Sequence, residues 1–212
     1  MVTSNKDLMT QAREALKGRW GLAIGAFFVY LLIIGVSSVI PPTKYVMVAG
    51  TQQAVFSFGN IIVLLIGGAF ALGIATFSLA IARKGEAKLE MIFSGFKYFG
   101  KALGLYLLVL LFVLLWMLLL IIPGIIASIS YSMAFYLMSD DPNIGIKEAM
   151  NKSKKMMYGY KWKYFCLGCR FIGWFLLGCL SFGIGFLWIL PYMQISFAKF
   201  YEDVKANSVE GQ

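Results

Sequence analysis

The segment 102–122 is the feature that most restricts how this chain can fold. It contains twenty-one consecutive residues, and none of them is charged. As an α-helix it would be roughly 31 Å long at about 1.5 Å per residue, close to the hydrocarbon thickness of a bilayer, about 30 Å. A helix without a polar face needs apolar surroundings on every side. The segment therefore predicts a membrane-spanning helix.

The composition extends this expectation to the rest of the chain. Hydrophobic residues make up 60% of it and charged residues only 14%, whereas soluble domains carry about 25% charged residues. The mean hydropathy is +0.78. These charges are too few to solvate the surface of a globular protein, so we expect an integral membrane protein.

The apolar stretches predict an all-α, polytopic membrane protein with about six transmembrane helices in three hairpins. Tight turns are expected at Pro123-Gly124 and at 181–183, and a short polar stretch, 43–53, separates the first two spans. The segment 1–20, with Ser4 and Asp7 in a capping-box arrangement, predicts a basic amphipathic helix on the membrane surface. The tail 201–212 is polar. The predicted spans are about 21–40, 54–82, 102–122, 123–139, 164–180 and 184–200, within one membrane domain, 1–212.

Basic residues gather on one side of this arrangement. If the two termini and the segments 83–101 and 140–163 share a face, that face holds 17 of the 19 Lys and Arg residues. The positive-inside rule makes it the cytoplasmic face, which predicts a multi-pass protein of the cell membrane with both termini in the cytoplasm. The net charge is +9. Because the cations flank apolar spans, anionic lipid headgroups of the cytoplasmic leaflet are the expected partner, and nucleic acid is not.

The segment 142–163 is the most basic part of the chain. Asp141 as N-cap and Pro142 at the first helical position predict a helix here, with Met150 and Met157 on one apolar face. Such a helix fits an anionic leaflet, with a docking face for a protein partner or a second copy of the chain as the alternative. The residues expected to contact anionic lipid are Lys147, Lys152, Lys154, Lys155, Lys161 and Lys163.

Two polar residues inside predicted spans form a possible intramembrane site. Arg170 is the one charged residue well inside a span, and such a group is a functional hypothesis by default. The alternative is that its long side chain reaches back to the phosphates of the inner leaflet. Gln194 follows Pro191 in the last span; it would hydrogen-bond a neighbouring helix or line a cavity. No acidic residue lies in a span to pair with Arg170, which disfavours a carboxylate-driven pump.

Motifs for catalysis are absent from the sequence. The chain has no histidine, and it lacks a P-loop, a G-x-S-x-G turn and a dinucleotide fingerprint. Asp140-Asp141 could begin a divalent-ion site at the membrane surface, but no further carboxylate follows nearby. We therefore expect no cofactor and no bound metal.

The second half of the chain resembles a known family. The run IPGIIASISYSMAFYLMSDDPNIGIKEAMNKSKKMMYGYKWKYFCL, then FIGWFLLG and GIGFLWILPYMQISFAKFYED, is similar to the bacterial integral membrane family called domain of unknown function 975. AREALKGRW and FSGF also fit, so the resemblance covers nearly the whole chain. It implies a multi-span bacterial membrane protein and carries over no catalytic residue.

Three functions are hypotheses that these observations support. The first is a non-enzymatic scaffold or accessory protein that binds anionic lipid or a partner membrane complex. The second is a channel or transporter for an anionic or amphipathic solute, with Arg170 and Gln194 lining the path. The third is a lipid-acting membrane enzyme that uses Asp140 and Asp141.

Overall fold

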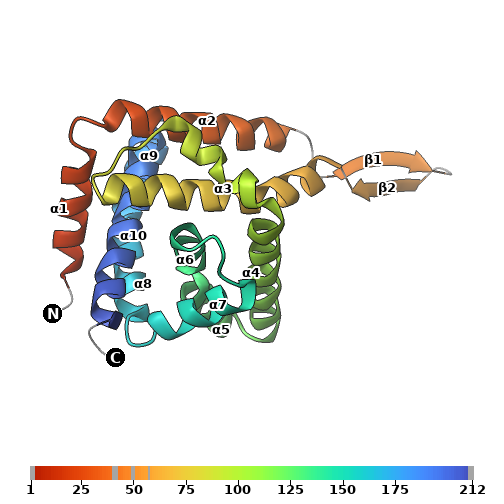
Figure 1. Ribbon diagram of the computed structural model, residues 1–212. Coiled ribbons are helices and arrows are strands. Elements are labelled where there is room, and N and C mark those ends of the chain that lie inside the picture. The colour runs from red at the N-terminus through yellow and green to blue at the C-terminus, as the bar shows by residue number, and fades with distance from the viewer. Residues whose placement is uncertain (1–2, 40–42, 49–50, 57, 210–212) are drawn as a thin grey trace.

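The computed structural model describes residues 3–39, 43–48, 51–56 and 58–209, with side chains for 3–33 and 64–208. These residues form a largely helical protein in which one small β-hairpin interrupts the order of helices (Figure 1). The elements are α1 (Asn5–Leu16), α2 (Trp20–Val39), β1 (Thr43–Val48), β2 (Thr51–Phe56), α3 (Phe58–Ala82), the 3₁₀ helix η1 (Leu89–Tyr98), α4 (Phe99–Leu119), α5 (Ile121–Tyr131), α6 (Ala134–Asp140), α7 (Ile146–Met156), α8 (Lys161–Arg170), α9 (Ile172–Leu180) and α10 (Phe186–Val209).

Several of these helices suit a bilayer. In the part of the chain that the structure describes, four are long and apolar enough to cross one: Leu64–Ala82, Leu89–Leu119, Ile121–Asp140 and Lys161–Leu180. A fifth is reached if α1 and the start of α2, which meet at a bend of 97°, count as one span. The predicted span 184–200 is not among them, because α10 contains Pro191 and Gln194 and continues into charged residues. A multi-pass membrane protein agrees with these helices; the number six and the three hairpins stay predictions.

The exposed residues at two apolar hairpin tips also agree with a lipid environment. Leu118 at the end of α4 is 88% exposed, and Phe182 in the turn after α9 is 99% exposed. Leu119, Ile121 and Leu180 beside them are also exposed. Contiguous apolar surface of this kind marks contact with lipid or with another protein. The tips are accordingly the described parts of the fold whose apolar side chains are least covered by the protein itself.

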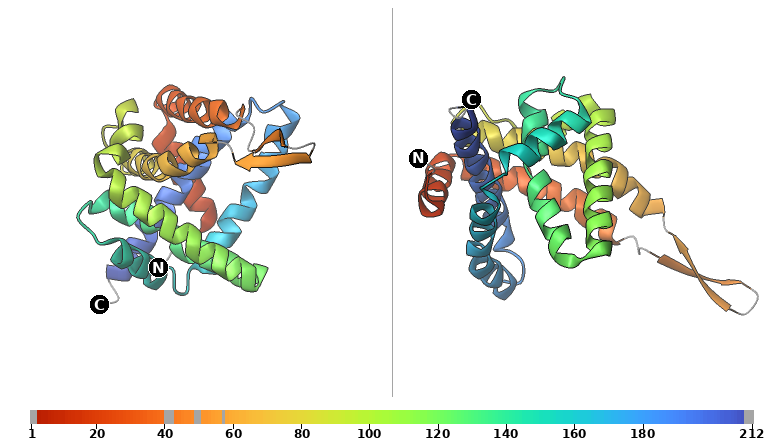
Figure 2. Two further views of the ribbon diagram at one scale, coloured as in Figure 1. Left: turned by 90° about the vertical axis from the view of Figure 1, so that its right-hand side faces the viewer. Right: turned by 90° about the horizontal axis from the view of Figure 1, so that it is seen from below.

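A β-hairpin replaces the polar loop expected at 43–53 and the first residues of the span expected at 54–82. β1 and β2 pair antiparallel from Thr43 with Phe56 to Val48 with Thr51, and the hairpin projects from the helical body (Figures 1 and 2). Both strands are rich in β-branched and aromatic residues, TKYVMV and TQQAVF, which favour strands over helices. The helix that follows therefore begins at Phe58.

α1 is amphipathic as predicted, but protein covers its apolar face. Ser4 caps the helix by accepting a hydrogen bond from the Asp7 amide at 3.2 Å. The apolar residues Leu8, Ala12, Ala15 and Leu16 are at most 3% exposed, because α1 packs along α10 and against α3 (Figure 1). The apolar residues of α1 therefore serve a protein core, and the placement of this helix on the membrane surface stays a prediction.

Glycines bring α3 and η1 into backbone contact. A Cβ added to Gly73 would lie 1.8 Å from the carbonyl oxygen of Ile92, and one added to Gly95 would lie 2.0 Å from that of Ala69. Gly68 approaches α4 in the same way, with the Ala102 oxygen 2.6 Å from an added Cβ. These contacts leave no space for a side chain. They fix the crossing of α3 with the two elements that follow it.

We predict that Gly73→Ala destabilises the protein, because its methyl group would collide with rigid backbone. The cost should be about 1–3 kcal/mol, typical of overpacking, and should appear as a lower thermal midpoint of the detergent-solubilised protein. Gly25→Ala is the matched control, because an added Cβ there meets nothing within 4 Å and alanine favours a helix. Equal midpoints for the two variants would contradict this account of the crossing.

Candidate functional site

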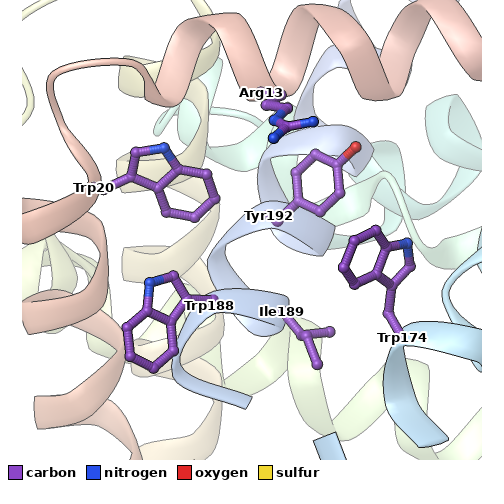
Figure 3. A pocket seen from close by; sticks show the side chains of 6 residues that line it. All are labelled: Arg13, Trp20, Trp174, Trp188, Ile189 and Tyr192. Atoms are coloured by element: carbon purple, nitrogen blue, oxygen red, sulfur yellow. The ribbon is translucent and has the colours of Figure 1, made fainter. Parts of the chain in front are cut away.

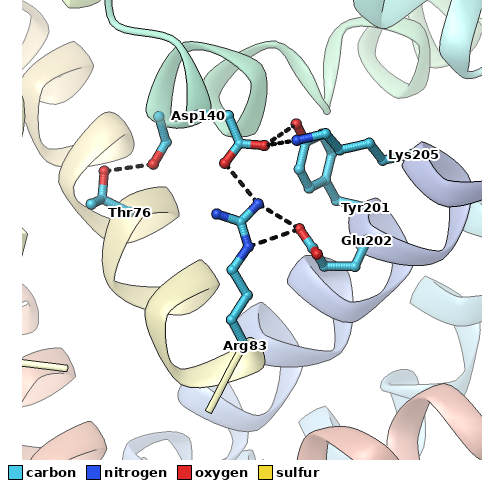
Figure 4. A network of polar contacts seen from close by, with 7 residues as sticks. Thr76, Arg83, Asp140, Tyr201, Glu202 and Lys205 are labelled. Carbon is cyan, nitrogen blue, oxygen red and sulfur yellow. Dashed lines mark hydrogen bonds and ion pairs between the residues drawn. The ribbon is translucent and has the colours of Figure 1, made fainter. Parts of the chain in front are cut away.

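A network of charged side chains joins three helix ends around Asp140, the last residue of α6. Arg83, just after α3, lies with Nη2 2.7 Å from Asp140 Oδ1, and it also donates from Nη2 to Glu202 of α10 at 2.7 Å. Tyr201 donates to Asp140 Oδ2 at 2.7 Å, and Lys205 forms an ion pair with the same oxygen (Figure 4). Asp140 is therefore occupied by partners within the chain.

A second network holds the N-terminal segment and α8 on the opposite side of α10. The Lys163 ammonium lies 2.8 Å from Asp203 Oδ2. Thr3 donates to Asp203 Oδ1 from its backbone amide at 3.1 Å and also from its hydroxyl, and Asn5 donates to the Lys163 carbonyl at 3.0 Å. Burial alone would raise the pKa of Asp203, but these hydrogen bonds and the Lys163 charge outweigh it and hold the pKa below its usual value.

The two networks lie at one end of the molecule. They join residues from the segments between the predicted spans that the count of basic residues assigns to one face. Thr3, Arg83, Asp140, Lys163 and Asp203 represent all four segments of the predicted cytoplasmic side, with Asp140 and Lys163 at the two ends of 140–163, and α10 connects them. Groups in direct hydrogen-bond contact lie on the same side of a bilayer. Their orientation toward the cytoplasm stays a prediction.

α7 begins later than predicted and is held by its apolar face. Asp141 accepts a hydrogen bond from the Asn143 amide at 2.9 Å in a turn, and the helix starts after Gly145. The expected N-cap role of Asp141 is therefore wrong, because its side chain stabilises the turn instead. Met150 is 5% exposed, and buried Ser153 donates to the Ser130 carbonyl of α5 at 2.8 Å.

The opposite face of α7 carries the predicted lysines. Lys147, Lys152, Lys154 and Lys155 are all exposed, and no ion pair among the described residues involves them. Lys161 and Lys163 are half-buried, and Lys163 is taken by Asp203. A cavity of about 560 Å³ lies between α6, α7 and α10 and is lined by Lys152, Lys155, Lys205 and apolar residues such as Ile144 and Met156.

Arg170 and Gln194 are not brought to a common site. Arg170 is exposed at the last residue of α8, where the chain continues into α9. Gln194 faces α6, and its Oε1 accepts a long hydrogen bond of 3.4 Å from Tyr136. Gln194 thus bonds a neighbouring helix, which was one of its two expected roles. A joint path along both residues gains no support from this placement.

An aromatic pocket lies on another part of the surface and was not predicted. Trp20 at the start of α2, Trp174 of α9, and Trp188 and Tyr192 of α10 surround a cavity of about 210 Å³, with Arg13 of α1 above them (Figure 3). The residues come from separate stretches of sequence, and none has a distinctive motif around it. Only the packing of α1 along α10 reveals the pocket.

No group of three or more His, Cys, Asp or Glu side chains that could hold a metal ion occurs within the described residues. Asp140 and Asp141 do not converge on one point: the first faces Arg83 and the second accepts from the Asn143 amide. The adjacent carboxylates thus serve two different structural contacts.

Comparison with known proteins gives one result. A family model described as "Protein of unknown function (DUF975)" matches residues 1–124 and 117–208. No curated protein matches the chain. No solved structure matches it either.

We predict that Asp140→Asn destabilises the fold while Asp141→Asn does not. The first change leaves Arg83 and Lys205 facing a neutral amide and should cost about 1–2 kcal/mol, since both cations are partly exposed and water screens them. The second retains an oxygen that can accept from the Asn143 amide. Thermal midpoints in detergent measure both; a loss as large in Asp141→Asn would show that Asp140 has no special role.

We also predict an acid-sensitive stability that depends on Asp203. A carboxyl whose pKa is lowered by folding stabilises the protein above its unfolded pKa, about 3.9, and this stabilisation is lost as the pH falls through the folded pKa. The midpoint of the natural protein should therefore fall more steeply from about pH 5 to about pH 3 than that of Asp203→Asn, which cannot titrate there. Parallel profiles would contradict the ion pair with Lys163.

Proposed function

The chain belongs to the family described as "Protein of unknown function (DUF975)", and from the geometry of its own residues we propose that it is a non-enzymatic membrane protein that binds anionic lipid headgroups through α7. One observation carries this proposal. Lys147, Lys152, Lys154 and Lys155 are exposed on one face of α7 and have no ion-pair partner among the described residues, while the other face is anchored in the protein.

The surroundings of α7 favour lipid over a soluble anion. The helix packs on α4 and α5, which carry the exposed apolar tip around Leu118 and Ile121. The lysines of α7 are therefore attached directly to the two helices whose exposed apolar tip suits contact with lipid. A lysine near an anionic membrane surface contributes about 1 kcal/mol to binding, and this contribution falls within a Debye length.

The cavity between α6, α7 and α10 provides a concave site beside these lysines. Lys152 and Lys155 line it without an ion-pair partner among the described residues, and Ile144 and Met156 supply an apolar wall. Asp140 and Asp141 also line the cavity. Arg83 and Lys205 compensate the charge of Asp140, and Asp141 accepts a hydrogen bond from the Asn143 amide. A phosphate with apolar substituents suits such a lining better than a metal ion or a nucleotide base.

The other two hypotheses are less well supported. A transport path along Arg170 and Gln194 would need both at one cavity, whereas one is exposed on α8 and the other faces Tyr136. A lipid-acting enzyme built on Asp140 and Asp141 would use a carboxylate that is already engaged by two cations. The accessory role, with anionic lipid as the proposed ligand, therefore remains our proposal.

We predict that replacing Lys152, Lys154 and Lys155 together with Gln weakens the selectivity for anionic lipid. In reconstituted vesicles, the preference for spin-labelled phosphatidylglycerol over spin-labelled phosphatidylcholine should fall by at least about fivefold at low salt, since three charges are lost. The natural protein should lose the same preference at high ionic strength.

The control variant replaces Lys6, Lys17 and Lys88 with Gln. These lysines are also exposed and lie outside α7, and their replacement removes the same net charge. It should retain most of the preference. Equal preferences in the α7 variant and the natural protein, or equal losses in the two variants, would refute a site on α7.

A further inference from the structure

The aromatic pocket is separate from the lysine face of α7. In Figure 1, α9 lies near the top of the molecule and α7 near the bottom. Tyr192 of the pocket and Asp203 of the second ionic network are roughly 17 Å apart along α10, at about 1.5 Å per residue. The pocket thus lies between the polar end of the protein and the apolar tip that follows α9.

The walls of the pocket are aromatic and incompletely covered. Trp174 and Trp188 are each 47% exposed, and Ile189, at 6%, forms part of the floor. Tyr192 is held edge-on between Phe171 and Trp174, with ring centroids 5.4 and 6.3 Å away. The position of the Tyr192 ring is therefore fixed by packing, while Trp174 and Trp188 stay about half exposed beside it.

The charge at the pocket points to an anion. Arg13 is exposed on α1 and its guanidinium projects toward the space beside Tyr192 (Figure 3). No ion pair among the described residues engages Arg13, and no carboxylate lines the cavity there. An aromatic cage alone would suit a quaternary ammonium, but an uncompensated arginine repels that group and favours a carboxylate or a phosphate.

The size of the pocket restricts the apolar part of the ligand. Its volume, about 210 Å³, is below the range of about 300–1,000 Å³ that holds a drug-sized ligand. One alkyl chain fits this space better than two chains or a folded molecule. We propose that the pocket binds a single-chain anionic amphiphile, with its carboxylate or phosphate on Arg13 and its chain between Trp20, Trp174 and Trp188.

The polarity along α10 sets the direction of this ligand. The ion pairs at Asp203 mark the polar end, and the exposed tip at Leu180 and Phe182 marks the apolar end. A head on Arg13 lets the chain continue past Trp188 toward the apolar tip. This orientation matches that of an amphiphile in a bilayer, so the ligand can enter from the lipid.

Tryptophan fluorescence tests this site directly, because bromine quenches an indole that it contacts. The protein has five tryptophans, and three of them line the pocket. In a Trp116→Phe, Trp162→Phe background, a brominated octadecanoate should quench the remaining emission at low concentration. Arg13→Gln should raise the concentration needed by about tenfold or more, and Arg13→Lys by less. A brominated octadecanol should act weakly on all three proteins.

Two further probes identify the source of the anion. If a brominated octadecyl phosphate quenches as well as the carboxylate, the site accepts both headgroups. If one of them quenches at lower concentration, that headgroup is the preferred ligand. A trimethylammonium of the same chain length should quench poorly. If it quenches as well as the carboxylate, or if Arg13→Gln leaves the carboxylate titration unchanged while the thermal midpoint shows a folded protein, the tryptophans are only membrane-interface anchors and the proposal is wrong.

Discussion

The charged end of α10 is the constraint on which the arrangement of the other helices depends. Tyr201 and Lys205 are one helical turn apart and so face the same carboxylate, Asp140, at the end of α6. Glu202 reaches Arg83, while Asp203 points to the other side and holds Lys163 and Thr3. A single stretch of sequence thereby fixes the ends of α3, α6 and α8 and the beginning of the chain. Because these groups are only partly buried, hydrogen bonds compensate for the water they lose.

The apolar interior is organised by short side chains as much as by long ones. Gly73 and Gly95 allow α3 and η1 to touch through their backbones, and Ala12 and Ala15 let α1 lie close against α10 and α3. Large residues such as Phe77, Phe200 and Tyr201 fill the space that remains and are fully buried. Close contacts and ion pairs thus cooperate: the first set the distances between helices and the second set which ends meet.

The sequence predicted features that depend on the solvent and missed features that depend on tertiary contacts. The absence of charge in 102–122 identified a helix that needs hydrocarbon, and α4 with its exposed tip agrees. Amphipathic patterns correctly placed helices at α1 and α7, but such a pattern shows which face is apolar, not what covers it. The β-hairpin was not predicted because it depends on a short local preference for strands. The pocket around Arg13 was not predicted because it joins residues from distant segments. The span expected at 184–200 coincides with a helix whose second half is charged.

For the lipid binding that we propose, the way α7 is held on the protein decides which property of a membrane it can detect. A surface helix that inserts its apolar side responds to gaps between lipid tails and hence to curvature. The apolar side of α7 is already committed to α4 and α5, with Met150 buried and Ser153 bonded to Ser130. The exposed side chains of α7 are all polar: four lysines together with Glu148 and Asn151. α7 would therefore act as a gauge of surface charge density, indifferent to how strongly the membrane bends.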